Sequence, residues 1–385
     1  MSVTPLAQAD RGHGHKASAL AVLLRAGLPV PDGFVVTDPA TDPRLIAAHL
    51  RRLGAGAVAV RSSAVAEDTE TASFAGQLAT VLGSRGLDEV LAAIQRCAAS
   101  TRTRRAQNYR THLDLDGEAS APVIVQKLVE ADHAGVLFTR DPRSGADRLV
   151  INASWGLGES VVSGEVVPDE LTVTPPTDAV RTTVGTKQTR VDLGERGLVR
   201  TSVPAAARAR GCLAPNEVTR LVALGRRCED LFGRPQDVEW AVRGGSVWIL
   251  QSRPITTLTS PVGRPDPDTG PTLVTGVPSS PGRVRGPARL VRSVDDFSRV
   301  QRGDVLVCRT TDPAWTPLFR LAAGVVTETG GVLCHAAIVA REYRIPAVVG
   351  ATGATTRVPD GEHVTIDGTL GTVAALPVHL ERRPR

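Results

Sequence analysis

The chain has 385 residues, which is enough for two or three domains with buried cores. Its 42% apolar residues, 22% charged residues and net charge of +5 are typical of a soluble globular protein, and its arginines are too scattered to indicate a nucleic-acid partner. It has no apolar run of about 18 residues, no basic segment leading into an apolar stretch, and five widely spaced cysteines, so we expect a cytoplasmic protein without a membrane span, secretory signal or disulfide framework.

The larger, N-terminal part of the chain alternates predicted helices and strands, which indicates an α+β fold. Helices are predicted over Ala17–Arg25, Leu87–Leu113 and Glu217–Phe232, and strands over Val123–Val129 and Gly135–Phe138. In the helix over Glu217–Phe232, the inward face is predicted to hold Val218, Leu221, Val222 and Leu231, with Gly233 as the C-terminal stop.

A predicted hairpin closes this part, with strands over Asp237–Val242 and Val247–Gln251. Pairing Arg243 with Val247 places Glu239 opposite Gln251, and alternation then divides the side chains between two faces. The predicted core face holds Val238, Trp240, Val242, Trp248 and Leu250, and the other face holds Asp237, Glu239, Gln251 and Arg253. The polar face is either a solvated surface or a metal–phosphate site, because carboxylate and amide oxygens bind Mg²⁺ and arginine binds phosphate.

Seven prolines between Pro254 and Pro281 interrupt any periodicity and predict a semi-rigid linker. The C-terminal part again alternates strands and helices, which predicts a second, smaller α/β domain. The strands are predicted over Val305–Arg309, Gly324–Val326, Ala347–Val349 and Val364–Ile366, and the helices around Ala314–Leu321 and over His335–Tyr343.

His335 follows two glycines, Gly330 and Gly331, and begins a predicted helix. The glycines allow a tight turn with exposed N–H groups, and a helix N-terminus favours anions and disfavours an imidazolium. Such a histidine stays neutral and nucleophilic and, once phosphorylated, finds hydrogen-bond donors. The alternative is a capping or packed histidine. A dyad with Cys334 is not favoured, because neighbours in sequence point apart.

Cations mark two other features. Arg61 is followed by Ser62 and Ser63 at the end of an apolar stretch, which suits an anion-binding loop but is also an ordinary loop composition. Of the 45 Lys and Arg residues, only Lys16, Lys127 and Lys187 are lysines. They either reflect codon bias or mark positions where a compact charge on a phosphate is needed.

A series of motifs runs along nearly the whole chain. The motifs are Ala26–Phe34, Val60–Ala64, Ser73–Gln77, Arg105–Arg110, Gly135–Pro142, Trp155–Glu159, Val162–Asp169, Phe232–Trp240, Leu250–Thr256 and Gly330–Glu342. Together they resemble the phosphohistidine-swivelling dikinases, which include phosphoenolpyruvate synthase, pyruvate phosphate dikinase and rifampicin phosphotransferase. The resemblance implies an ATP-grasp nucleotide-binding domain over residues 1–256, a Pro-rich linker over 257–281 and a swivelling phosphohistidine domain over 282–380.

The resemblance also implies an ATP-dependent phosphotransferase with ATP and Mg²⁺ as cofactors, in which His335 takes a phosphoryl group from ATP and passes it to an acceptor, with release of AMP and phosphate. The implied site residues fall into groups: Lys16, Arg61 and Arg105 hold the triphosphate, Gln126, Lys127 and Leu128 line the adenine pocket, Glu239 and Gln251 bind Mg²⁺, and Arg253 contacts phosphate. The hairpin face leads to the same last three residues. Lys187 receives no role.

The chain departs from the family pattern at a few positions, among them His15 and Arg344, which both replace a usual glycine. It also lacks the family's acceptor domain, so we expect the acceptor site on a partner protein. Two alternatives stay open: a self-contained small-molecule phosphotransferase with the acceptor bound between the domains, and a non-catalytic ATP-binding phosphocarrier module. The acceptor and the oligomeric state are not predicted.

Overall fold

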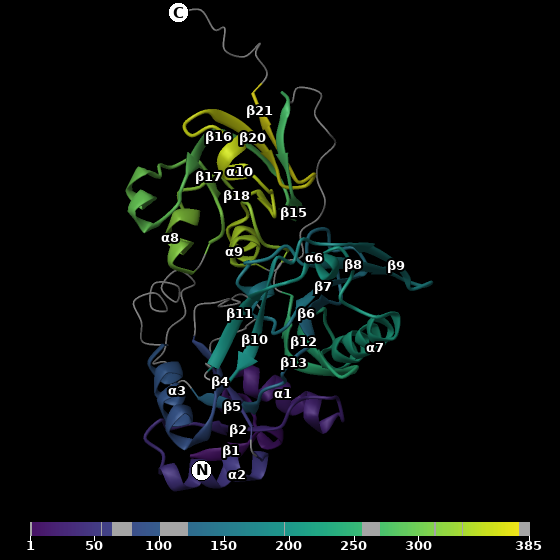
Figure 1. Ribbon diagram of the computed structural model, residues 1–385, viewed down its shortest axis with the longest axis vertical. Helices are drawn as coiled ribbons and strands as arrows, with labels where there is room; N and C mark the ends of the chain where they lie inside the picture. Colours follow the sequence, from purple (N-terminus) through teal and green to yellow (C-terminus); the bar gives the residue numbers. More distant parts are fainter. Residues whose placement is uncertain are drawn as a thin grey trace, which may run out of the picture.

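The structure, a computed structural model, describes residues 2–54, 56–63, 79–100, 122–195, 197–255, 270–311, 313–332 and 334–376. Its main β-sheets follow one another along the long axis of the molecule (Figure 1). We name them the N-terminal sheet, the central sheet and the C-terminal sheet, in the order in which the chain forms them.

The N-terminal sheet has the strand order β1-β2-β5-β3-β4. Its strands are β1 Val3–Pro5, β2 Gly33–Val36, β3 Val58–Ser62, β4 Thr80–Ser84 and β5 Val123–Lys127. The helices of this region are α1 His15–Arg25, α2 Pro43–Leu53 and α3 Gly86–Ser100, with 3-10 turns at Leu6–Gln8 and Arg11–His13. The core between α2, α3 and the sheet is built from buried side chains such as Phe34, Ile46 and Ile94. The part of the predicted Leu87–Leu113 helix beyond Ser100 lies outside the described residues.

The central sheet is antiparallel and has the order β13-β12-β6-β7-β8-β9. Its strands are β6 His133–Phe138, β7 Leu149–Trp155, β8 Asp169–Thr174, β9 Ala179–Thr183, β12 Gln236–Arg243 and β13 Ser246–Pro254. On one face, α7 Pro215–Phe232 and α1 bury a large apolar core around Trp240. The other elements of this region are α5 Glu159–Val162, α6 Ala205–Arg208 and the hairpin β10 Thr189–Gly194 and β11 Gly197–Ser202.

Two details of this region correct the sequence analysis. Helix α7 ends at Gly233 in the left-handed conformation, as predicted, but Leu231 is 42% exposed and Cys228 is buried in its place. In the hairpin, Arg243 pairs with Ser246 rather than Val247, and a β-bulge between Glu239 and Trp240 shifts the register. Because the turn has two residues rather than the predicted three, Val247 and Ile249 pair with Val242 and Trp240, and the core face of β13 carries them instead of the predicted Trp248 and Leu250.

The C-terminal sheet has the order β14-β21-β20-β16-β17-β18-β19-β15. Its strands are β14 Thr272–Thr275, β15 Val277–Ser280, β16 Arg283–Leu290, β17 Val305–Cys308, β18 Gly324–Thr327, β19 Ala347–Val349, β20 His363–Asp367 and β21 Thr372–Ala375. The helices of this domain are α8 Thr316–Phe319, α9 His335–Tyr343 and α10 Ala354–Arg357, and 3-10 turns lie at Val294–Arg299 and Pro313–Trp315. Strands β14 and β15 lie inside the predicted linker, so the linker prediction is wrong for residues 272–280. Both are edge strands, where a proline such as Pro278 is tolerated.

Helix α9 spans the predicted residues and ends at Arg344, whose φ of 56° is left-handed. Glycine adopts this conformation more easily than an L-residue such as arginine. Among the described helices, none combines the length and the apolar character needed to cross a bilayer.

Candidate functional site

Glu239 and Gln251 lie directly opposite each other on neighbouring strands, as the sequence predicted. A guanidinium nitrogen of Arg61 lies 3.8 Å from the Glu239 carboxylate and donates a hydrogen bond of 3.1 Å to the Leu250 carbonyl. Three of the predicted site residues, one from the N-terminal sheet and two from the central sheet, therefore meet where the two sheets approach each other.

Another carboxylate belongs to this group. Glu159 begins α5, and burial, helped by the neighbouring carboxylates of Glu165 and Glu239, raises its pKa. Glu159 ends the Trp155–Glu159 motif, but no role was predicted for it from the sequence. Its position next to Glu239 makes it a candidate site residue, and its only signal in the sequence was its place after a Trp-Gly-Leu-Gly turn.

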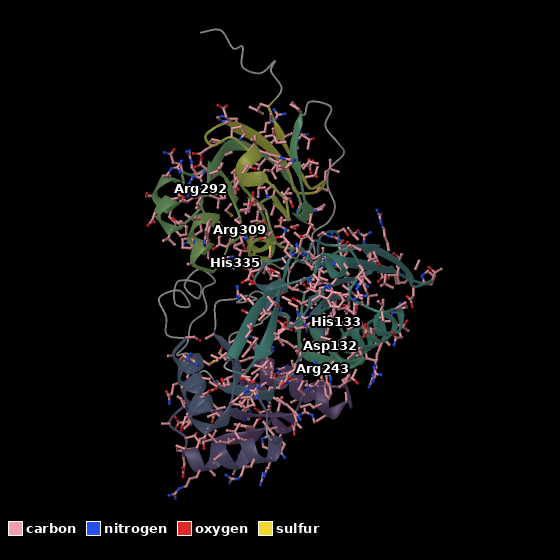
Figure 2. All side chains as sticks on the ribbon, viewed as in Figure 1. Asp132, His133, Arg243, Arg292, Arg309 and His335 are labelled. Carbon is pink, nitrogen blue, oxygen red and sulfur yellow. The ribbon has the colours of Figure 1, made fainter. Side chains whose placement is uncertain are left out.

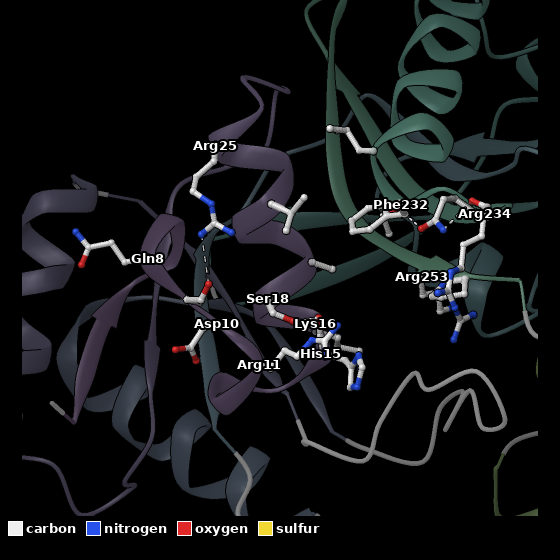
Figure 3. A pocket seen from close by; sticks show the side chains of 17 residues that line it. Gln8, Asp10, Arg11, His15, Lys16, Ser18, Arg25, Phe232, Arg234 and Arg253 are labelled. Atoms are coloured by element: carbon white, nitrogen blue, oxygen red, sulfur yellow. Dashed lines mark hydrogen bonds between the residues drawn. The ribbon is translucent and has the colours of Figure 1, made fainter.

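Arg253 lies across β12 and β13 from Asp237, and its Nε atom donates a hydrogen bond of 2.9 Å to the Asp237 carboxylate. Arg253 and Lys16 both line a cavity of about 890 Å³. Arg11 and His15 lie beside Lys16, while Arg253 comes from the opposite wall (Figure 3). The cavity thus gathers cations from the start of α1 and from the end of the hairpin, an arrangement suited to a polyanion.

The start of α1 is attached to the end of β3, which places Lys16 and Arg61 in one region. The Ser63 hydroxyl donates to the His13 carbonyl at 2.9 Å and accepts from the Ala17 amide at 3.1 Å. Gly14 has a φ of +86°, and a Cβ there would overlap the Ser63 carbonyl, so glycine is required at this position.

Of the three residues predicted to line the adenine pocket, Gln126 and Lys127 end β5, and Leu128 begins the connection to β6. Gln126 is buried, and its side-chain amide donates to the Pro31 carbonyl at 3.0 Å. The backbone amides of Lys127 and Leu128 donate to the carbonyls of Asp32 and Ala57, and the Lys127 side chain is exposed. The predicted triphosphate residue Arg105 lies outside the described residues.

His335 is the first residue of α9 and is buried. Its Nδ1 atom lies 2.9 Å from the Thr311 hydroxyl and its Nε2 atom 3.4 Å from the Thr316 hydroxyl, and its ring stands nearly perpendicular to the Phe319 ring. The sequence analysis did not identify Thr311, whose signal was a pair of threonines just after β17. Burial raises the pKa of the adjacent Cys334 thiol to about 11, which agrees with the rejection of a Cys–His dyad.

The loop before His335 packs against the central sheet. We call residues Thr329–Val332 and Cys334 the His loop, and Gly164–Pro168 the docking segment. Val332 packs with Val136 of β6 and Val166 of the docking segment. Val136 pairs with Glu239, and paired residues share a face of a sheet, so the His loop covers the face that carries Glu239 and Gln251. Figure 2 shows His335 at the end of its domain that meets the rest of the chain.

One buried arginine holds this loop from inside its own domain. The Arg341 guanidinium donates to the Val332 carbonyl at 2.8 Å and to the Ser279 carbonyl at 2.9 Å. Its burial lowers its pKa to about 10. The sequence analysis included Arg341 in a motif without a role, since an arginine on an otherwise apolar helix face has no distinctive local pattern.

The donor set fits a magnesium ion better than a transition metal. The described residues contain no group of three His, Cys, Asp or Glu side chains arranged around a point. Mg²⁺ does not need one, because it takes hard oxygen ligands and is commonly held by one or two protein groups together with substrate phosphates and water. Glu239 and Gln251 supply two such oxygens on the strands that also carry Arg253 into the cationic cavity.

Comparison with known proteins agrees with this geometry. Residues 44–269 match the family model described as pyruvate phosphate dikinase, AMP/ATP-binding domain, and residues 300–371 match the one described as PEP-utilising enzyme, mobile domain. The chain is 43% identical over 318 residues to a probable phosphoenolpyruvate synthase of Methanothermobacter thermautotrophicus, with 82% of this chain and 46% of that protein covered. It is 39% identical over 350 residues to phosphoenolpyruvate synthase of Escherichia coli, with 82% and 43% covered. The chain thus spans about half the length of the curated relatives it matches.

Proposed function

This chain belongs to the pyruvate phosphate dikinase and phosphoenolpyruvate synthase family, an ATP-grasp domain followed by a mobile phosphohistidine domain, and we propose that it is an ATP-dependent phosphotransferase whose His335 receives a phosphoryl group from ATP. The observation that carries the proposal is the position of the His loop. It lies on the face of the central sheet that presents Glu239 and Gln251, where the phosphates of a bound nucleotide would be held.

In this proposal the triphosphate lies against Lys16, Arg61, Arg105 and Arg253, the adenine lies at residues 126–128, where β5 ends, and Glu239 and Gln251 hold Mg²⁺. When bound there, the ion would neutralise charge on the phosphate oxygens. Thr311 holds Nδ1 of His335 and so fixes the orientation of the ring, which leaves Nε2 as the nucleophile. Overall, ATP, water and the histidine give AMP, inorganic phosphate and phosphohistidine.

For the second half of the reaction, we propose that the phosphoryl group passes to an acceptor bound by a partner protein. The two family models describe a nucleotide-binding domain and a mobile domain, which supply the donor and the carrier. The names of the relatives make pyruvate the first acceptor to test. Turnover of pyruvate or another metabolite by the purified chain would instead support a site between the two domains.

The proposal is tested by incubating the chain with Mg²⁺ and ATP labelled at either the β- or the γ-phosphate. We expect one of the two labels to appear, in acid-labile form, on the peptide that contains His335 and the other to appear in inorganic phosphate, with formation of AMP rather than ADP and no label in His335→Ala. Formation of ADP, or label in the alanine variant, would contradict it. Nucleotide binding without any label would support a non-catalytic module.

A further inference from the structure

The Lys187 side chain is completely buried, although it carries an ammonium group. Its Nζ atom contacts the Asp169 carboxylate and donates to the carbonyls of Gly185 at 3.0 Å and Arg208 at 3.3 Å. An ammonium has three donors and no acceptor, so these partners account for its full hydrogen-bonding capacity. A buried cation is tolerated in a fold only where such partners offset its lost hydration, so removing its charge would leave Asp169 buried without its partner.

The partners of this ion pair lie directly behind the docking segment. Asp169 follows the last residue of that segment, and its carboxylate also accepts the backbone amides of Gly185 and Cys212, each at 2.9 Å. The Lys187 amide donates to the Val167 carbonyl at 3.2 Å. A Cβ at Gly185 would overlap the carbonyl oxygens of Val167 and Pro168. The backbone of Gly185 therefore packs directly against the backbone of the docking segment.

The front of the docking segment meets the His loop just as closely. The Thr329 hydroxyl donates to the Gly164 carbonyl at 2.7 Å. A Cβ on Gly164 would lie 2.6 Å from the Cβ of Cys334, and one on Gly331 would lie 2.9 Å from the Pro168 ring. Because the backbones of Gly164 and Gly331 lie directly against the side chains of Cys334 and Pro168, a small displacement of the segment would open or block the contact.

We propose that the Lys187–Asp169 ion pair holds the docking segment in the shape that receives the His loop, which makes Lys187 a positioning residue for phosphorylation of His335. The inference rests on the proposed function. Lys187 touches neither the nucleotide site nor the His loop, and acts through the segment that lies between it and the loop. An error of about 1 Å in the placement of reacting groups can cost a hundredfold in rate, so rigidity at this contact matters for transfer.

The test compares Lys187→Met, which keeps the length of the side chain but removes its charge, with the wild-type chain. Two quantities are measured: the Kd for ATP by equilibrium binding, and the rate of label transfer to His335 at saturating ATP. We expect a rate at least about tenfold lower with a Kd within about twofold of wild type. Loss of ATP binding in step with the rate would overturn the proposal, because it would show a general effect on the ATP-grasp domain.

A double-mutant cycle with Thr329→Val separates positioning from simple stabilisation. If Lys187 acts through the docking segment, Thr329→Val slows the wild-type chain but has little further effect in the Lys187→Met background. If the two losses multiply, the proposal is wrong. Glu217→Gln is the matched control, since it removes a charge from another buried pair, with His133 at 3.1 Å, on the side of the central sheet covered by α7. We expect it to label at close to the wild-type rate.

Gly164→Ala keeps the proposal falsifiable if Lys187→Met does not fold, because it leaves the ion pair intact and obstructs Cys334 directly. We expect it to slow labelling without weakening ATP binding, and a wild-type rate would overturn the proposal. Labelling of the wild-type chain separates failure of the proposed function from failure of the proposed role of Lys187. If it forms no phosphohistidine, the proposed function fails; if it does and Lys187→Met labels equally fast, only this inference fails.

Discussion

Glu239 faces Gln251 because the hairpin that carries them contains a β-bulge. Without the bulge, the two-residue turn that pairs Arg243 with Ser246 would place Leu250 opposite Glu239. The extra residue turns the Gln251 amide to the same side as the Glu239 carboxylate, a known use of bulges beside active sites. The pairing needed for a two-oxygen cation site is thus produced by a local irregularity in the strand.

The first prediction concerns this pair. We expect Glu239→Gln to lower the rate of His335 phosphorylation by at least about 100-fold, because it removes the formal negative charge from the proposed Mg²⁺ site. The measurement is label transfer at saturating MgATP over a range of Mg²⁺ concentrations. Asp230→Asn, on the exposed side of α7, is the control for loss of a carboxylate, and an equal effect in both variants would contradict the assignment.

A second prediction concerns Thr311, whose hydroxyl lies 2.9 Å from Nδ1 of His335. We expect Thr311→Val to slow phosphorylation by roughly 10–100-fold, the scale seen when the orienting partner of a functional histidine is removed. Binding of ATP should not change, because Thr311 lies in the C-terminal domain. Thr316→Val, which removes a longer contact of 3.4 Å, should have the smaller effect. The reverse order would indicate that Nδ1 is the phosphorylated atom.

A third prediction follows from the Cys334 thiol, whose pKa burial raises to about 11. An ordinary thiol has a pKa of about 8.5, so at that pH Cys334 should react with iodoacetamide about two orders of magnitude more slowly in the native chain than in urea. Because the folded state favours the neutral thiol, the stabilisation from this group is complete below pH 8.5. Above pH 8.5 this stabilisation decreases by about 1.4 kcal/mol per pH unit as the pH rises toward 11. Mass spectrometry of the Cys334 peptide measures the labelling, and equal rates in both states would refute the prediction.

The fourth prediction is that Arg344→Gly stabilises the C-terminal domain by about 0.5–1 kcal/mol. Arg344 ends α9 with a φ of 56°, a conformation that costs an L-residue about 1–2 kcal/mol, and the added backbone freedom of glycine in the unfolded chain offsets part of the gain. Denaturant unfolding monitored by tryptophan fluorescence measures the change. Arg357→Gly, at the last residue of α10, is the control and should be destabilising.

The elements that the sequence predicted well are those with strong local signals. Helix α9 spans the predicted residues because its apolar periodicity begins at His335 and ends before Pro346. Helix α7 is likewise bounded by a proline at its start and by Gly233 at its end. The polar face of the hairpin was identified because carboxylates stand out at alternate positions of an otherwise apolar strand.

What escaped prediction depends on contacts between segments far apart in the sequence. The register of β13 depends on the length of the turn and on a bulge that has no signature in one strand, so the core face of β13 was misassigned although Glu239 and Gln251 were paired correctly. Strands β14 and β15 were read as linker because proline obscures strand periodicity, and only their places at the edges of the C-terminal sheet make them acceptable. The burial of Lys187 follows from Asp169, which is 18 residues away along the chain.

The contact between the His loop and the docking segment has a consequence for timing. The surface of the loop that lies against Gly164 and Pro168 is hidden in this structure. Under the proposed function, an acceptor that takes the phosphoryl group from His335 would need this end of the domain exposed, so loading and delivery would exclude each other within one molecule. The proposed half-reactions would then alternate, which predicts ping-pong kinetics, and an excess of ATP or of the acceptor would slow the cycle by holding the C-terminal domain at one site.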